Sequence, residues 1–83
     1  MKITYTLHAE EKLKRADIKR FKITKKLIGT ILKNPEIESR TKYGDYSAVS
    51  KLDSTHDIRL IYAIIPGGIR LITFHISKKG RYR

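Results

Sequence analysis

The chain has 83 residues, and its 19 Lys and Arg against 8 Asp and Glu give a net charge of +11 at pH 7. This length predicts a single domain over residues 1–83, and the absence of cysteine excludes a disulfide framework and a thiolate zinc site. No run approaches the ~20 apolar residues of a membrane span, and Met1 precedes a lysine and an alternating strand instead of an apolar signal core. We therefore expect a soluble, unexported, cytoplasmic protein.

The positive charge predicts a polyanionic or acidic partner. Cations at this density repel one another in the compact state unless a partner of opposite charge neutralises them. Nucleic acid is the commonest polyanion in a cytoplasm, so RNA, DNA or an acidic protein is expected. The alternative, a basic amphipathic helix on an anionic membrane, needs a large aromatic-rich apolar face that the predicted helices lack. We expect nucleic acid and no membrane contact.

The amino-terminal part carries strand and helix patterns. Residues 2–6 (KITYT) alternate like a strand, with Ile3 and Tyr5 on one face, and Thr6 can cap a helix over residues 7–20. The apolar stripe predicted for this helix consists of Leu7, Ala9, Leu13 and Ala16.

A second helix is predicted to begin after Thr24, its N-cap, and to stop at Asn34, because the residue before Pro35 is disfavoured in helical geometry. Its apolar face consists of Leu27, Ile28, Ile31 and Leu32.

The carboxyl-terminal half carries strand and turn patterns. Residues 36–42 and 46–52 are expected to form two strands. The strongest pair, 58–65 (IRLIYAII) and 69–76 (IRLITFHI), reads as a hairpin joined by 66–68 (PGG). This order predicts an α+β fold, in which an N-terminal strand and two helices pack on one face of a mostly antiparallel four- to five-stranded sheet.

The register of this hairpin decides which side chains share a face, because a slip of one residue moves every side chain to the other side. A three-residue loop pairs Ile65 with Ile69 and places Arg59 directly opposite His75. A two-residue Gly-Gly turn would spread polar groups over both faces, so we expect the three-residue loop. The expected core face carries Ile58, Leu60, Tyr62, Ile64, Ile72, Phe74 and Ile76, with Arg70 near the turn. The opposite face then carries Arg59, Ile61, Ala63, Leu71, Thr73 and His75.

Two parts of the chain resemble known families. Residues 8–15 (HAEEKLKR) and 31–36 (ILKNPE) resemble a small uncharacterised family whose pattern is HA, two residues, R, and a later helix ending in NPE. Residues 59–62 (RLIY), 72–75 (ITFH) and a basic end with Tyr82 resemble the carboxyl half of RelE/ParE-type toxins. Both groups are branches of one ribonuclease-like superfamily, and together the resemblances span nearly all of the chain.

The chain departs from these families at three places. Lys12 stands where the small family has arginine, and residues 17–21 (DIKRF) resemble an insertion between the two helices. Only Lys51 can stand for the cluster of lysines on the middle strand of RelE toxins.

The resemblance implies a RelE-like fold and a toxin that cleaves RNA without a metal or another cofactor. RelE-type toxins cut messenger RNA on the ribosome, ParE-type relatives act on gyrase, and BrnT-like ones are again ribonucleases. Ribosome-bound mRNA is therefore one implied substrate, and an acidic antitoxin is an implied partner. The second hypothesis is a non-catalytic basic module of the same fold that binds nucleic acid or a protein. An open edge strand is compatible with a homodimer in either case.

Metal-free RNA cleavage uses the ribose 2′-OH as nucleophile, and it needs a base, an acid for the leaving 5′-oxygen and cations for the phosphate. The resemblance makes Arg59 the phosphate clamp, unless it pairs with Asp53 or Asp57. His75 is the expected acid or base, unless it only closes a strand end. Tyr82 is expected to stack on a base or to hydrogen-bond a phosphate, unless the chain end is frayed.

Two further catalytic candidates lie outside the hairpin. Lys51 can bind phosphate or act as a base, and is otherwise a solvated lysine, whereas His8 matches the HA motif and otherwise caps or packs in a first helical turn. Metal binding is not expected, because His8, His56 and His75 are far apart in the sequence. The basic stretch 12–26 is a second expected backbone-binding surface. The cations expected to position RNA are Arg15, Lys78, Lys79, Arg81 and Arg83.

Overall fold

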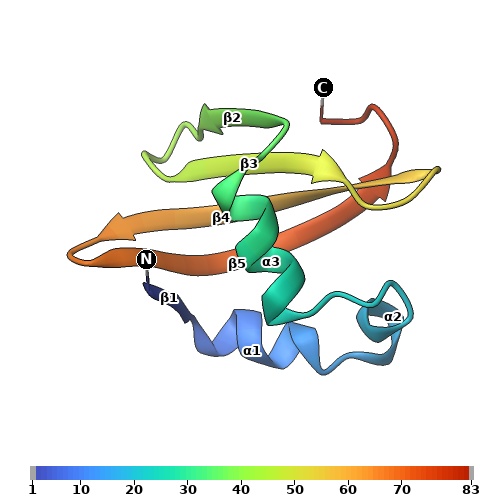
Figure 1. The fold of residues 1–83 in the computed structure, drawn as a ribbon, viewed down its shortest axis with the longest axis horizontal. Coiled ribbons are helices and arrows are strands. Elements are labelled where there is room, and N and C mark those ends of the chain that lie inside the picture. Colours follow the sequence, from blue (N-terminus) through green and yellow to red (C-terminus); the bar gives the residue numbers. More distant parts are fainter. Residues whose placement is uncertain (1, 83) are drawn as a thin grey trace.

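A five-stranded sheet of order β1-β5-β4-β3-β2 organises the computed structural model, which describes residues 2–82 (Figure 1). The pairings β2–β3, β3–β4 and β4–β5 are antiparallel, whereas β1 runs parallel to β5. The predicted α+β arrangement is confirmed, and the sheet is mixed because its first strand is parallel to its last. The strands are β1 Lys2–Tyr5, β2 Ile37–Arg40, β3 Tyr46–Lys51, β4 His56–Ile65 and β5 Gly68–Lys78.

Within residues 2–82 the helices are α1 Leu7–Leu13, α2 Ala16–Lys19 and α3 Lys25–Lys33. None of these helices is long and apolar enough to cross a bilayer. The predicted caps are confirmed: the Thr6 hydroxyl accepts from the Ala9 amide at 3.1 Å, and the Thr24 hydroxyl accepts from the Leu27 amide at 3.1 Å.

The single helix predicted over residues 7–20 is wrong, because the chain turns out of helical geometry at Arg15 (φ −69°, ψ 140°). Ile18 follows Ala9 by nine residues, so in a continuous helix it would lie about 180° around the axis from Ala9 and face water. The break turns Ile18 into the core, where it is 6% exposed. The segment that resembles an insertion therefore adds core surface.

The core lies between the helices and one face of the sheet, and α3 crosses that face (Figure 1). Leu7 was expected in this core but is 74% exposed, because at about 100° per residue it lies far around α1 from the buried Ala9. Ala16, beyond the break, is also exposed. The buried apolar residues are Ala9, Ile18, Ile23, Ile28, Ile31, Leu32, Ala48, Ile58, Leu60, Tyr62, Ile69, Leu71 and Phe74.

The turn of the β4–β5 hairpin differs from the predicted three-residue loop. Ile65 pairs with Gly68, so the turn consists of Pro66 and Gly67. Gly67 has φ 79°, and a proline followed by a glycine at positive φ is the pair that a type II turn favours.

A β-bulge in the same hairpin shifts the register by one residue between Ile61 and Tyr62, and Ile72 is the unpaired residue on β5. Because of the bulge, the faces predicted for β5 are wrong on the turn side. There Leu71 is fully buried and Ile69 is 8% exposed. Ile64, expected in the core, is 62% exposed. Beyond the bulge, Leu60 and Phe74 face the core as predicted.

Candidate nucleic-acid interface

Arg59 on β4 and His75 on β5 are direct cross-strand partners, as predicted. Directly opposite residues of an antiparallel pair share a face, and the neighbours Leu60 and Phe74 are both buried on the other side. Arg59 and His75 therefore stand on the sheet face opposite the helices, which we call the open face. The open face also carries Ser47 and Val49 of β3, Ile61 of β4 and Thr73 of β5.

The chain after β5 folds back over part of the open face. The amide of Lys79 donates to the Thr55 carbonyl at 2.9 Å, and the amide of Gly80 donates to the Asp57 carboxylate at 3.0 Å. Gly80 takes φ 90°, a conformation that glycine adopts readily. These bonds hold Lys79 and Gly80 against the start of β4 and the loop before it.

This folded-back segment brings Tyr82 to Arg59. The Arg59 guanidinium carbon lies 5.8 Å from the centroid of the Tyr82 ring, within the range of a cation–π contact. Arg59, Arg81 and Tyr82 line a groove of about 290 Å³, which we call the tail groove, with Val49 in its wall. The alternative ion pair of Arg59 with Asp53 is not formed, since the Asp53 carboxylate accepts from Thr55 and His56.

Arg59 also lines a second groove of about 500 Å³ beside the β2–β3 loop. Its other walls are Arg40, Thr41, Lys42, Tyr43, Asp45 and Ile61. Tyr43 is 81% exposed there, with the Lys42 ammonium 5.2 Å from its ring centroid. An exposed aromatic ring among cations has the chemistry to stack on a nucleobase. Arg59 lines both this groove and the tail groove.

Lys12 on α1 approaches His75 from the edge of the sheet. β1 pairs with β5 only as far as Leu71, and α1 borders the continuing strand beyond that point. The Lys12 ammonium donates to the Phe74 carbonyl and lies 3.5 Å from Nδ1 of His75. Because an ammonium can only donate, Nδ1 accepts in this contact and the proton of a neutral His75 ring is on Nε2.

The surroundings of His75 lower its pKa below 6.5. Desolvation is the largest cause, and the positive charges of Lys12, Arg59 and His8 follow. The pKa of Lys12 is also lowered, by desolvation and by Arg15. His75 is therefore mainly neutral at pH 7, and the second predicted histidine, His8, is one of the groups that lower its pKa.

Lys51, a predicted catalytic residue, lies on the open face, but it lines neither of the two grooves beside Arg59. It stands directly opposite the buried Asp57, two residues along β3 from Val49, which is the β3 partner of Arg59. Its backbone amide donates to the Glu36 carboxylate at 2.6 Å, which fixes the end of β3 against the α3–β2 connection.

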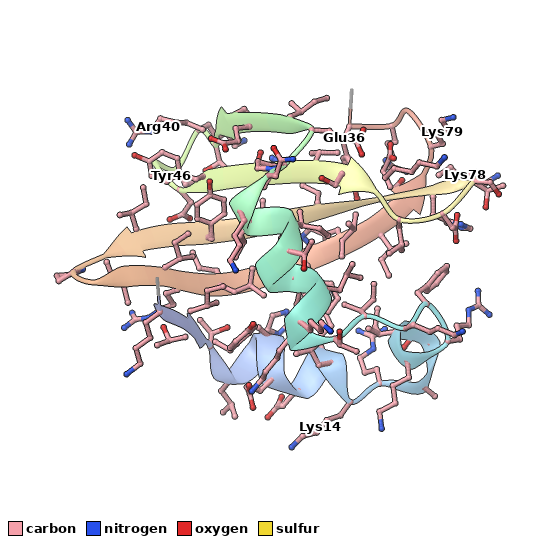
Figure 2. All side chains as sticks on the ribbon, in the orientation of Figure 1. Lys14, Glu36, Arg40, Tyr46, Lys78 and Lys79 are labelled. Atoms are coloured by element: carbon pink, nitrogen blue, oxygen red, sulfur yellow. The ribbon has the colours of Figure 1, made fainter. Side chains whose placement is uncertain are left out.

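The cations predicted to position RNA do not lie at one place. Arg81 lines the tail groove, Lys79 is exposed, and Arg83 lies outside the described residues. Arg15 and Lys78 line a third hollow of about 440 Å³ at the outer edge of β5, which we call the edge cleft. Figure 2 shows Lys78 and Lys79 at the end of the sheet where β5 finishes. The edge cleft is lined by Lys12, Arg15, Asp17, Ile18, Arg20, Phe21, His56, His75, Ile76, Ser77 and Lys78.

Lys12 and Arg20 were predicted only as members of the basic stretch 12–26, and His56 was not predicted to be a site residue. Lys12 follows His8 by four residues and precedes Arg15 by three, spacings that place all three on one side of a helix, and these residues line one shallow hollow on α1. This spacing is the feature of the sequence that indicates a place for Lys12 beside His8 and Arg15. Nothing local indicates that Arg20 and His56 meet in the edge cleft, because they come from segments far apart in the chain.

Within residues 2–82, no three His, Asp or Glu side chains are grouped so that they could hold a metal ion. Comparison with known proteins found no matching family model, no matching curated protein and no matching solved structure.

Proposed function

We propose that the protein binds RNA across the open face and cleaves it without a metal, in the manner of a RelE-like toxin. The observation that carries the proposal is the convergence of Arg59, His75 and Tyr82 from β4, β5 and the folded-back chain end. A phosphate at the Arg59 guanidinium would be held by a planar fork that matches its oxygens.

In the proposed reaction the ribose 2′-oxygen attacks phosphorus, the bond from phosphorus to the 5′-oxygen breaks, and a 2′,3′-cyclic phosphate forms. His75, through its Nε2 proton, donates to the leaving 5′-oxygen, and the Lys12 ammonium behind Nδ1 supplies the compensating proton. Arg59 stabilises the negative charge that develops on the phosphate oxygens. His8 is the neighbouring imidazole available to accept the 2′-OH proton.

The test is cleavage of a labelled RNA by purified protein in EDTA, with a second reaction on ribosomes in magnesium. Wild type should leave 2′,3′-cyclic phosphate ends, and R59A and H75A should each cut at least about 10²-fold more slowly. K33A is the control, because Lys33 is an exposed cation at the end of α3. Variants that cut as fast as wild type, or a wild type inactive in both reactions, would remove the catalytic proposal.

A second candidate function, RNA binding without cleavage, is favoured by the cations of the edge cleft. Most of them lie away from the Arg59 and Tyr82 contact, and phosphate contacts of this kind position RNA whether or not it reacts. Binding that weakens steeply with salt in the absence of cleavage is the outcome expected for this function.

A further inference from the structure

The edge cleft joins the open face to the helix side of the molecule. His75 belongs to both, since it stands opposite Arg59 on the sheet and also lines the cleft. The cleft is bordered by α1 and α2 on one side and by the end of β5 on the other. Its position follows from the short β1, which leaves the outer edge of β5 without a strand partner beyond Leu71 within residues 2–82.

The lining of the edge cleft is strongly cationic. Lys12, Arg15, Arg20 and Lys78 line it together with a single carboxylate, Asp17. Most of the side chains that line it are charged or polar, which does not suit an apolar ligand. A phosphodiester carries one negative charge and several acceptor oxygens, so it is the ligand chemistry that this lining fits.

Two rings, Phe21 and His56, lie among these charges in the lining of the cleft. The Phe21 and His56 rings meet edge to face with centroids 5.0 Å apart, and the Arg20 guanidinium carbon lies 5.1 Å from the Phe21 ring centroid. The interruption of the helix at Arg15, which turns Ile18 into the core, also brings Arg20 and Phe21 to the edge cleft. Cations interleaved with rings are typical of surfaces that follow a single nucleic-acid strand.

We infer that the edge cleft is a second phosphate-binding subsite, which holds the part of the same RNA strand that passes over His75 and leaves the open face. This inference rests on the proposed RNA binding and adds the path of the strand. The strand runs from the tail groove past Arg59 and His75, over the free edge of β5, and along Arg20 and Lys78.

The Asp17 carboxylate competes with an RNA phosphate for Arg15 in this subsite. Its carboxylate receives two hydrogen bonds from the Arg15 guanidinium, at 3.1 and 2.8 Å, and both side chains are 58% exposed. An exposed ion pair of this kind is weak, so an RNA phosphate can replace the carboxylate as the partner of Arg15. The ion pair therefore reduces the affinity for RNA without closing the cleft.

The test measures the affinity of wild type and of R20A/K78A for a fluorescent single-stranded RNA of about 12 nucleotides. The RNA is 2′-O-methylated so that it cannot be cut. Counterion release predicts that the loss of two phosphate contacts lowers the slope of log K against log salt by about 1.4. This slope change corresponds to about 25-fold weaker binding at roughly 0.1 M salt. The control K33A/R70A removes an exposed lysine of α3 and an exposed arginine of β5 near the turn, both outside the stretch 12–26, so its net charge is matched.

A second pair of variants tests the cleft in the opposite direction. D17N removes the carboxylate and frees Arg15, so one contact is gained and binding should strengthen about fivefold at roughly 0.1 M salt. E38Q removes the same charge from β2 and should change affinity less. Circular dichroism of each variant establishes that the fold is kept.

The outcomes separate this inference from the proposed function. If R20A/K78A and K33A/R70A weaken binding equally, or if neither does, the subsite is refuted while cleavage by wild type still supports the function. If cleft variants alone weaken binding but wild type cuts no RNA, the subsite stands and the catalytic proposal fails. Wild type that does not bind the RNA overturns both.

Discussion

The Arg59 guanidinium lies over the ring of Tyr82, and this contact joins a strand of the central sheet to the folded-back chain end. It leaves the hydroxyl of Tyr82 out of the interaction. In the cationic surroundings of the open face, the ring thus orients the guanidinium that is proposed to bind phosphate.

Substitution of Tyr82 should separate its ring from its hydroxyl. A cation–π contact contributes about 0.5–1 kcal/mol at partly exposed sites, so Y82A should lower kcat/KM for RNA about two- to fivefold. Y82F keeps the ring and should remain near wild type. Equal losses in both variants would show that the hydroxyl contributes and that the ring contact does not.

The hydrogen bond from Gly80 to Asp57 should control whether the chain end stays on the open face. Bonds to charged groups contribute about 1.5–3 kcal/mol, so D57A should lower the free energy of unfolding in urea by at least this amount. D57N keeps an acceptor oxygen and should lose less. Hydrogen exchange at the Gly80 amide is the direct readout, and slow exchange in D57A would contradict the assigned role.

Removal of the Lys12 charge should raise the pKa of His75. Desolvation, Lys12, Arg59 and His8 lower this pKa below 6.5 in the folded protein, so K12M should move it upward and leave the other three causes in place. An NMR titration of the His75 ring gives the value. K14M is the control on the same helix, because Lys14 is exposed and points away from the sheet (Figure 2).

The same pKa shift sets a pH dependence of stability. The unfolded chain takes up the His75 proton near pH 6.5, whereas the folded protein takes it up only at lower pH. The free energy of unfolding should therefore fall as pH decreases below about 6.5, until the folded pKa is passed. This fall should be smaller in K12M than in K14M, and identical pH profiles would count against the Lys12 contact.

Gly68 should be the least replaceable of the glycines described. A Cβ atom there would lie 1.9 Å from the Lys2 carbonyl oxygen, so β1 must move away from β5 in G68A, at a cost of roughly 1–3 kcal/mol. At Gly29 in α3 the contact would be an ordinary 3.6 Å to Ile3, so G29A should be neutral or stabilising, since alanine is the better helix former by about 1 kcal/mol. Thermal unfolding of both variants compares them directly.

The elements with local causes could be predicted from the sequence. Thr6 and Thr24 cap helices because their hydroxyls reach amides three residues on, and Pro35 stops α3 by the geometry it imposes on Asn34. The helix break at Arg15 could not be read in this way. It depends on burial of Ile18 against the sheet, which no periodicity within the segment expresses.

The alignment of Arg59 with His75 was predicted correctly although the loop was not. The turn is one residue shorter than expected, and the bulge at Ile72 adds one residue on β5, so the two deviations cancel beyond the bulge. Between the turn and the bulge they do not cancel, and Leu71 is buried instead of exposed. The approach of Lys12 and Tyr82 required tertiary packing, because each comes from a separate segment.

The parallel pairing of β1 with β5 also determines when the protein can fold. Lys2 pairs with Gly68, so within residues 2–82 the first strand finds its sheet partner in the last one. Contacts between such distant segments form slowly, because a large loop must close first. During synthesis the edge strand has to wait for β5, and Arg59 cannot meet His75 until that same strand has emerged. The proposed site therefore cannot assemble until residues 75–82 have been synthesised.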